Sequence, residues 1–393
     1  MRGRVQGELT AVPRPIRILH LITGLGVGGA ETMLLKLLGG LDRERFASTV
    51  VSMTEPGALA PQIARLGIPV HTLGLNRGLP NPLALPKLLR LTRQFRPAIL
   101  QSWMYHADVL GYFAARAARV PKLVWNIRCS DLDFPTTSHS LRAVFATHGF
   151  LSRFTDATIV NSAAGMKFHR SHGHNSRRWE LIQNGFDVAR FRPDAAQRAR
   201  GRAELGLYDG QIAIGMVARF DRYKDHATFI AAAKLLHERE PRAVFVLAGK
   251  GMTEHNEQIG GLLRAAKLAE QTRLLGEYAD PSRLFPSLDI ATLCSFTEGF
   301  PNAVGEAMSC ELPCVASDVG DSALLLGDAG RVVPPCNPQA VADAWSELIG
   351  LGPAGRQQIG TAARVRIQER FSLQAIVAAY DRLYSELASD SSR

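Results

Sequence analysis

Short apolar strands alternate with helical segments along this chain, and that alternation decides its fold class. Residues 16–23 (IRILHLIT) have the composition of a strand, and a glycine-rich turn follows them. The next segment places Met33, Leu34 and Leu37 on one face of a helix. Similar apolar runs then recur between helical segments as far as residue 184. Strands that alternate with helices in this way predict a parallel, doubly wound α/β sheet.

The alternation breaks once and then restarts. Residues 184–200 (NGFDVARFRPDAAQRAR) are polar and rich in arginine, as expected of a linker, and a strand pattern resumes at 211–219 (QIAIGMVAR). A chain of 393 residues is also too long for one ordinary core. We therefore expect two Rossmann-like domains, 1–195 and 196–370, followed by an amphipathic helix at 371–387.

Composition narrows the class of protein. Hydrophobic residues make up 46% of the chain and charged residues 21%, which is typical of a globular protein. No apolar run reaches the roughly 18–20 residues that a membrane span requires. The first 15 residues lack the apolar core of a signal peptide, so a cytoplasmic location is expected. The five cysteines are sparse, and buried thiols are favoured over a zinc site for Cys310 and Cys314.

Charge is distributed unevenly between the two halves. Residues 1–197 hold 25 Lys and Arg against 12 Asp and Glu, whereas the remainder holds 21 against 24. The basic first half indicates an anionic partner, and an anionic membrane surface or a phosphorylated substrate is favoured over nucleic acid because no nucleic-acid module is recognisable. Residues 86–97 (PKLLRLTRQFRP) predict an amphipathic helix that either lies on anionic lipid or is an ordinary solvated helix.

Residues 24–31 (GLGVGGAE) lie between the first strand and the first helix. Gly24, Gly26 and Gly29 fit the G-x-G-x-x-G pattern of dinucleotide-binding turns. That pattern also calls for an acidic residue about 20 positions later, and the candidate, Glu55, lies 26 residues after Gly29. The glycines are therefore read in two ways: as a turn whose amides approach a phosphate at a helix start, or as a purely structural turn.

Residues 217–226 (VARFDRYKDH) follow the first strand of the second half. Arg219 lies just past the strand end, and Lys224 precedes a helix that Asp225 is expected to cap. Open α/β sheets bind ligands at the carboxyl ends of their strands. Two cations at that edge could bracket a diphosphate, although either one alone is more often an ordinary surface residue.

Residues 295–310 (SFTEGFPNAVGEAMSC) repeat the arrangement of strand end, loop and helix start. Pro301 and Asn302 are expected to open the helix, with the asparagine side chain capping it. Glu298 on the loop could accept a hydrogen bond from a sugar hydroxyl, and Glu306 could hold the two hydroxyls of a ribose. The alternative is two exposed carboxylates that merely stabilise a positive helix end.

Taken together, GGAE, RFDRYKDH, NGFD…FRP and the E-x7-E segment EGFPNAVGEA resemble family-4 retaining glycosyltransferases of the GT-B fold. The resemblance covers roughly residues 16–385, and its most specific parts are EGFPNAVGEAM and VASDVGD. It implies two Rossmann-like domains facing each other across a cleft. The N-terminal domain would bind the acceptor, the C-terminal domain would bind a nucleotide-sugar, and the last helix, within 371–393, would cross back to the N-terminal domain.

The resemblance also implies roles for individual residues. Arg219 and Lys224 would contact the donor diphosphate, and Glu306 the ribose. Gly28 and Gly29 would form the N-terminal loop that faces the same diphosphate. The remaining donor residues would hold the transferred sugar: Glu298 and the amides of Phe300, Pro301 and Asn302.

The family places an active-site histidine in the segment that corresponds to residues 100–111 (LQSWMYHADVLG), and here the candidate is His106. Its alternative is a structural histidine. Arg128 is a candidate contact for an acceptor phosphate. Asp131 and Asp133 form a D-x-D pair that would suit a metal-dependent transferase of a different fold, but E-x7-E speaks against that assignment, so neither a metal nor another cofactor is expected.

The implied reaction is transfer of a sugar from a nucleotide-sugar, with UDP the commonest choice in the family, to a glycan or lipid-linked acceptor. The basic first half favours an acceptor that is anionic or held at a membrane, such as a polyprenyl-diphosphate-linked sugar of a surface polysaccharide. The protein would then lie in the cytoplasm or at the inner face of the plasma membrane. The alternatives are a nucleotide-sugar epimerase or hydrolase, an NAD-dependent oxidoreductase, and a non-catalytic binding protein on the same scaffold.

Overall fold

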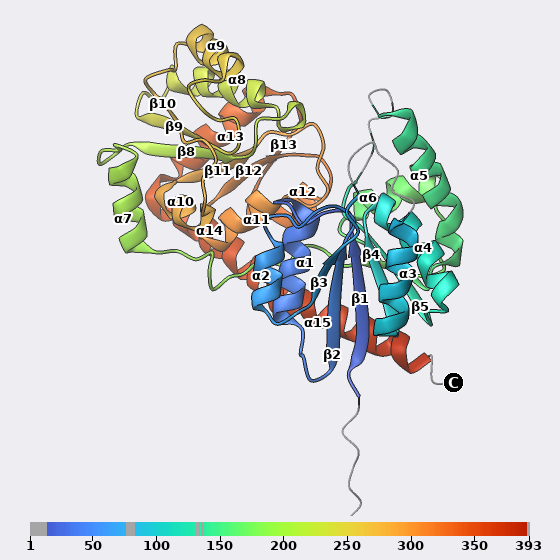
Figure 1. Ribbon diagram of the computed structural model, residues 1–393. Helices are drawn as coiled ribbons and strands as arrows, with labels where there is room; N and C mark the ends of the chain where they lie inside the picture. Colours follow the sequence, from blue (N-terminus) through green and yellow to red (C-terminus); the bar gives the residue numbers. More distant parts are fainter. Residues whose placement is uncertain (1–13, 76–82, 131, 133, 135–136, 391–393) are drawn as a thin grey trace, which may run out of the picture.

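The computed structural model describes residues 14–75, 83–130, 132, 134 and 137–390. In this part of the chain two parallel sheets form separate α/β units, and helices cover both faces of each sheet (Figure 1). The two units lie beside each other, with the N-terminal unit drawn in blue and green. The predicted fold class, two doubly wound parallel-sheet domains, is confirmed.

The N-terminal sheet comprises seven strands among the described residues, in the order β3-β2-β1-β4-β5-β6-β7. They are β1 (Ile16–Ile22), β2 (Phe46–Ser52), β3 (Val70–Thr72), β4 (Ile99–Trp103), β5 (Lys122–Ile127), β6 (Ala157–Val160) and β7 (Trp179–Leu181). All neighbouring pairs are parallel. The chain order reverses between β1 and β4, and such a switch point opens a crevice at the carboxyl ends of the strands.

Alternate residues of the central strand pack on opposite faces of this sheet. Ile18 and Ile22 join a core with α1, α2 and the C-terminal helix, whereas Leu19 and Leu21 join a core with α3 and α4. A strand buried on both faces is mostly apolar, which explains the residues Ile18–Ile22 of IRILHLI. The polar members of the strand are Arg17, which is exposed, and His20, which is buried. The helices are α1 (Gly29–Gly40), α2 (Ala60–Arg65), α3 (Ala84–Phe95), α4 (Tyr105–Ala118), α5 (His139–Leu151), η2 (Ser152–Phe154) and α6 (Ala163–Ser171).

The C-terminal sheet has six strands among the described residues, in the order β10-β9-β8-β11-β12-β13. They are β8 (Ile212–Val217), β9 (Ala243–Ala248), β10 (Thr272–Leu274), β11 (Ile290–Leu293), β12 (Cys314–Ser317) and β13 (Gly330–Val333). Its helices are α7 (Ala195–Glu204), η3 (Arg222–Lys224), α8 (His226–His237), α9 (Glu257–Ala266), α10 (Pro281–Leu284), η4 (Phe285–Ser287), α11 (Asn302–Ser309), α12 (Ser322–Leu326), α13 (Pro338–Gly350) and α14 (Gly352–Arg370). No helix in the described ranges is long and apolar enough to cross a membrane.

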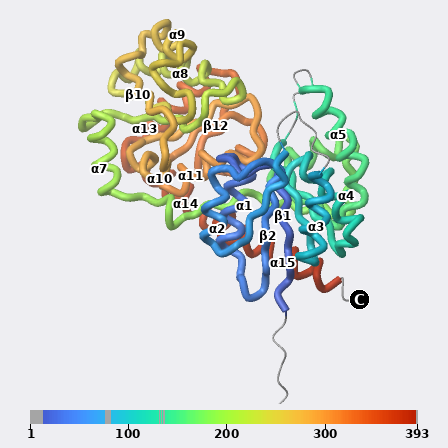
Figure 2. Tube along the Cα trace, viewed as in Figure 1, coloured from blue at the N-terminus to red at the C-terminus, as the bar shows by residue number. Residues whose placement is uncertain are grey.

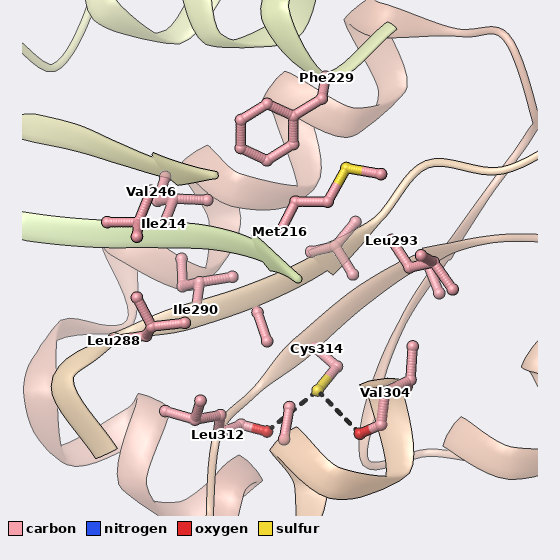
Figure 3. Close-up of a cluster of buried hydrophobic side chains, with 14 of the residues drawn as sticks. Ile214, Met216, Phe229, Val246, Leu288, Ile290, Leu293, Val304, Leu312 and Cys314 are labelled. Atoms are coloured by element: carbon pink, nitrogen blue, oxygen red, sulfur yellow. Dashed lines mark hydrogen bonds between the residues drawn. The ribbon is translucent and has the colours of Figure 1, made fainter. Parts of the chain in front are cut away.

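Aliphatic and aromatic side chains fill the C-terminal core between the sheet and its helices. Figure 3 shows Met216, Phe229 and Leu293 around the central strands, with the Cys314 thiol below them. The Cys314 Sγ lies 3.4 Å from the carbonyl oxygen of Leu312. Cys310 and Cys314 are both buried, as predicted, and burial raises the pKa of the Cys310 thiol to about 12.

The chain passes between the two units twice (Figure 2), and the two passages meet. The Phe186 N–H donates to the carbonyl of Phe371 at 2.9 Å, and the Leu373 N–H donates to the carbonyl of Phe186 at 2.8 Å. Helix α15 (Leu373–Ser389) then packs on α1 and on β1 of the N-terminal unit, so the last helix crosses back. The domain limits at residues 195 and 371 fall outside both sheets and stay predictions.

Candidate active site between the two sheets

A cavity of about 510 Å³ lies between the two units. Residues that follow β5 and cap or begin α5 form its N-terminal wall, and loops that follow β8 and β11 form its C-terminal wall. Among the described residues, the N-terminal wall contributes uncharged side chains only, whereas the C-terminal wall contributes charged ones. The lining residues are Cys129, Ser130, Leu132, Thr137, Ser138 and Leu141 on the first side, and Arg219, Tyr223, Lys224, Thr297, Glu298 and Gly299 on the second.

The structure brings Arg219, Lys224 and Glu298 to this cavity, as the sequence predicts. The Lys224 ammonium forms an ion pair with Glu298 Oε1, and both side chains are largely buried, with exposed fractions of 22% and 10%. The Arg219 side chain is 65% exposed, and its Nε lies 3.1 Å from Asp221 Oδ2. Asp225 caps α8 as predicted, since its carboxylate accepts from the Thr228 N–H at 3.2 Å.

The loop that carries Glu298 is held from both units. Ser295 Oγ donates to Glu298 Oε1 at 2.7 Å, and the Phe296 N–H donates to the carbonyl of Tyr223 at 2.9 Å. From the other unit, the Ser130 hydroxyl donates to the carbonyl of Glu298. The carboxylate therefore has a fixed position at the edge of the cavity, beside a cation.

Two helices start beside this loop without a side-chain cap. The first residue of α11 is Asn302 and the first residue of α1 is Gly29, and neither preceding cap residue provides a side-chain hydrogen bond. The Glu31 carboxylate lies against Gly28 in the first turn of α1. A Cβ atom on Gly29 would lie 3.7 Å from Asn302 Nδ2, so the two helix starts face each other across the gap between the units. Uncapped N–H groups at two facing helix ends provide a site for an anion.

Two details of the predicted loop are wrong. Asn302 does not cap α11, because its Oδ1 accepts from Asn184 Nδ2 at 2.8 Å instead. Pro301 occupies the cap position and, being proline, has no N–H to offer a sugar. The Phe300 ring is buried and stacks on Phe186, so only the backbone of Phe300 is left to contact a ligand.

Glu306 does not line the cavity. It lies on α11 and interacts electrostatically with Lys36 of α1, whose Nζ is 3.2 Å from the carbonyl oxygen of Gly185. Burial raises the pKa of Glu306 from 4.5 to about 6, against the opposing attraction of Lys36 and Arg190. Burial also lowers the pKa of Lys36.

The two candidates from the N-terminal unit lie elsewhere. His106 is exposed near the start of α4, at the carboxyl edge of the sheet, and partial desolvation lowers the pKa of its ring. The Arg128 guanidinium is directed to the C-terminal helix: Nη2 donates to the Tyr380 hydroxyl at 2.8 Å, and Nη1 to Asn184 Oδ1 at 3.1 Å. Arg128 is not among the residues that line the cavity, and its acceptor role stays a prediction.

Sequence reasoning assigned no role to two residues that join the units. Asn184 accepts a hydrogen bond from Arg128 and donates one to Asn302. Since Arg128 also donates to Tyr380, this series of hydrogen bonds connects the C-terminal helix to the start of α11. Asp321 lies in the C-terminal unit, yet its carboxylate accepts from the backbone N–H groups of Ala163 and Ala164 at 2.7 and 3.1 Å, at the start of α6. Both residues fall within segments that carry the resemblance, NGFD and VASDVGD, so the signal was present without a function attached to it.

Nothing among the described residues gathers three or more His, Cys, Asp or Glu side chains in a way that could hold a metal ion. The D-x-D residues Asp131 and Asp133 lie outside the described part of the chain.

The structure thus has two parallel α/β sheets that face each other across a cavity, with cations and helix starts at the strand termini. Family comparisons specify the class. A model described as glycosyltransferase family 4 matches residues 27–190, and one described as glycosyl transferases group 1 matches residues 211–350. The chain is therefore a glycosyltransferase with the GT-B fold.

Individual relatives agree with this assignment. The chain is 27% identical to the putative glycosyltransferase EpsF of Bacillus subtilis, over 77% of this chain and 79% of EpsF. It is 26% identical to the UDP-Gal:alpha-D-GlcNAc-diphosphoundecaprenol alpha-1,3-galactosyltransferase of Escherichia coli, over 62% of this chain and 63% of that enzyme. Among solved structures, Anabaena HepE in complex with UDP superimposes with a TM-score of 0.82 at 22% identity, covering 94% of this chain and all of HepE, which is a likeness of fold.

Proposed function

We propose that this protein transfers a sugar from a nucleotide-sugar, most simply UDP-linked, to a lipid-linked glycan acceptor in the synthesis of a surface polysaccharide, with retention of anomeric configuration. The observation that carries the proposal is the interdomain cavity lined by Arg219, Lys224 and Glu298. The starts of α1 and α11 do not line it, but they face each other across the same gap between the units.

Charge balance supports a nucleoside diphosphate as the ligand. Arg219 and Lys224 supply two positive charges, and Glu298 removes one of them. The starts of α1 and α11 each act as about half a positive charge. Asp221, the ion-pair partner of Arg219, removes another charge, so the sum is about one positive charge and neutralises part of the two negative charges of a sugar-linked diphosphate. Departure of the diphosphate can thus be assisted by groups that are already in place, and such preorganised electrostatics usually dominate catalysis.

The remaining donor residues then take defined positions. In this proposal Gly28 and Gly29 form the loop that faces the diphosphate, and the Glu31 carboxylate, which lies against Gly28, moves aside when the donor binds. The backbone N–H groups of Phe300 and Asn302 face the transferred sugar. Glu298 accepts from a hydroxyl of that sugar, and Glu306 accepts from the ribose. HepE, which shares the fold, was solved with UDP, and this supports a uridine nucleotide for the present chain.

The acceptor approaches from the N-terminal wall, whose Ser130, Thr137 and Ser138 hydroxyls suit the hydroxyls of a glycan. The E. coli relative acts on a sugar held by diphosphoundecaprenol, which supports a polyprenyl-diphosphate-linked acceptor here. His106 is exposed at the same edge of the sheet and is proposed to orient the transferred sugar or the acceptor hydroxyl. We expect replacement of His106 by Ala to lower kcat by about 10–100-fold, while donor binding is retained.

The test is a panel of nucleotide-sugars with and without acceptor. Thermal stabilisation identifies the donor, and product analysis by NMR with a diphosphate-linked acceptor reports transfer and anomeric configuration. We expect one uridine-linked sugar to stabilise the protein and to be consumed only when acceptor is present. Conversion of the donor without acceptor would indicate an epimerase or a hydrolase instead, and stabilisation by NAD but by no nucleotide-sugar would contradict the proposal entirely.

A further inference from the structure

Three neighbouring helices on one side of the N-terminal sheet form a basic surface without exposed carboxylates. Helices α3, α4 and α5 pack side by side (Figure 1), and all three lie wholly within the described residues. Asp108, the one acidic residue in the three, is fully buried, and its Oδ2 lies 3.0 Å from His148 Nε2. The exposed cations of these helices and of the residues that follow them are Lys87, Arg90, Arg93, Arg96, Arg116, Arg119 and Arg153.

Aromatic side chains lie among these cations. Phe113 of α4 is 49% exposed and Phe150 of α5 is 58% exposed. Tyr112 and Phe154 connect them, since the ring centroids of Tyr112 lie 5.4 Å from Phe113 and 6.0 Å from Phe154, and Phe154 lies 6.2 Å from Phe150. The Arg153 guanidinium covers the Phe150 ring at 4.6 Å. We call Lys87, Arg90, Arg93, Arg116 and Arg153, together with Phe113 and Phe150, the basic aromatic face.

The opposite side of the same sheet has a different composition. There Arg45 forms an ion pair with Asp381 of α15, and Glu386 of α15 accepts from Arg178 at 2.7 Å. Among the described residues, α1, α2 and α15 carry no large exposed hydrophobic side chain. The opposite side thus carries both signs of charge, whereas the described surface of α3, α4 and α5 exposes cations and aromatic rings.

We propose that the basic aromatic face docks on the surface of an anionic lipid bilayer. Clusters of four to eight Lys and Arg bind anionic lipid headgroups, and aromatic side chains that lie among them favour the boundary between headgroups and acyl chains. This inference rests on the proposed function for its purpose, because a lipid-linked acceptor is presented at a bilayer. It extends the prediction for residues 86–97 from one helix to a surface built from three.

The position of α5 connects this face to the active site. Ser138, which caps α5, and Leu141 in its first turn line the interdomain cavity, whereas Phe150 lies at the other end of the helix on the basic aromatic face. A bilayer bound to the basic aromatic face would hold a lipid-linked acceptor beside the protein. Helix α5 would then extend from the bilayer to the interdomain cavity. A second copy of the chain fits this face poorly, because it would bring cations against cations without carboxylates to pair them.

The experiment measures co-sedimentation of the full chain with vesicles of phosphatidylcholine that contain 30% phosphatidylglycerol, and with vesicles of phosphatidylcholine alone. Each cation near an anionic surface contributes about a fivefold change in partitioning. The triple variant Lys87→Gln, Arg90→Gln and Arg93→Gln should therefore lower binding to anionic vesicles about 100-fold. The double variant Phe113→Ala and Phe150→Ala should lower it roughly tenfold.

The matched control changes two exposed arginines on the opposite side, Arg65→Gln of α2 and Arg382→Gln of α15, and should bind as the wild type does. Circular dichroism confirms that each variant is folded. Equal binding of wild type and triple variant, or equal binding to neutral and anionic vesicles, would overturn the proposal. So would a dimer in analytical ultracentrifugation that the triple variant dissociates, because the occupant would then be a second copy.

Failure of this inference is distinguishable from failure of the proposed function. Transfer to a water-soluble acceptor analogue does not require the bilayer, so the triple variant should retain it. Vesicle binding without any sugar transfer would leave docking intact and contradict the function. Sugar transfer without vesicle binding would contradict docking and leave the proposed function intact.

Discussion

The two sheets use their carboxyl edges in different ways. In the C-terminal unit, charged side chains that follow β8 and β11 point into the interdomain cavity, as Lys224 and Glu298 do. In the N-terminal unit, the described residues of the corresponding edge contribute a glycine turn and an uncharged wall, and Arg128, directly after β5, is directed to α15. Within the described residues, one unit thus supplies fixed charge to the cavity and the other supplies uncharged side chains.

The largest expected effect tests the charged side of this comparison. Replacing Lys224 with Ala removes a cation from the diphosphate site and leaves Glu298 unpaired beside it, so we expect kcat/KM to fall by about 10²–10³-fold. Steady-state kinetics with the preferred donor measure the change. The control is Lys234→Ala, which removes an exposed cation on the outside of α8 and should change nothing. Near-normal turnover of Lys224→Ala would remove the diphosphate assignment.

A smaller effect tests the neutral side. Replacing Arg128 with Leu removes a donor from Asn184 Oδ1 and one of two donors from the Tyr380 hydroxyl, which also accepts from Asn126 Nδ2 at 2.9 Å. Loss of such buried hydrogen bonds typically lowers the free energy of unfolding by about 1–3 kcal/mol. Urea denaturation measures the loss, and Arg43→Leu on the exposed surface is the control. If the variant keeps its stability and instead raises KM for the acceptor, the acceptor contact is right and the comparison between the two edges is wrong.

The smallest effect concerns Glu306, which lies where the two units meet. In the folded protein the pKa of Glu306 is about 6, above the ordinary glutamate value of 4.5. Because the folded state favours the protonated carboxyl, the contribution of Glu306 to stability is present below about pH 4.5 and is lost as the pH rises through 6. The variant Glu306→Gln should therefore gain stability relative to the wild type between pH 4.5 and 7, by about 1 kcal/mol.

Affinity for the donor should rise with pH, whereas the contribution of Glu306 to stability falls. In the proposed function an ionised Glu306 would accept hydrogen bonds from both ribose hydroxyls, so wild-type affinity for the donor should rise several-fold from pH 5 to 7. Isothermal titration at both pH values measures it, and the Gln variant should show a flat profile. A pH-dependent affinity that persists in Glu306→Gln would assign the titration to another group.

The sequence predicts the position of a site residue when the groups near it follow strands of the same sheet, and it does not when those groups come from distant segments. Arg219, Lys224 and Glu298 follow strands of one sheet, and parallel strands bring their carboxyl ends to one edge, so local patterns were sufficient. The partners of Arg128 and Asn302 come from α15 and from the segment between the sheets, far away in the chain. No strand or helix pattern contains that information, and the cap predicted for Asn302 failed because Asn184 takes its side chain.

The fold could be predicted from the sequence because it too depends on local patterns. The alternation of strands and helices is local, and mostly apolar runs such as IRILHLI mark strands that are buried on both faces. The basic aromatic face was only partly readable. Residues 86–97 showed the cations, but Phe113 and Phe150 lie on different helices, and their exposure depends on how those helices pack.

The return of α15 has a consequence for the nascent chain. Ile376 and Tyr380 belong to the same core as Ile18 and Leu34, yet α15 begins at Leu373, 192 residues after β7 ends at Leu181. At 5–20 residues per second, the ribosome needs roughly 10–40 s to supply those side chains. Throughout that interval the first unit lacks part of its interior and exposes apolar surface, so this half of the protein is the part that a chaperone would have to protect during synthesis.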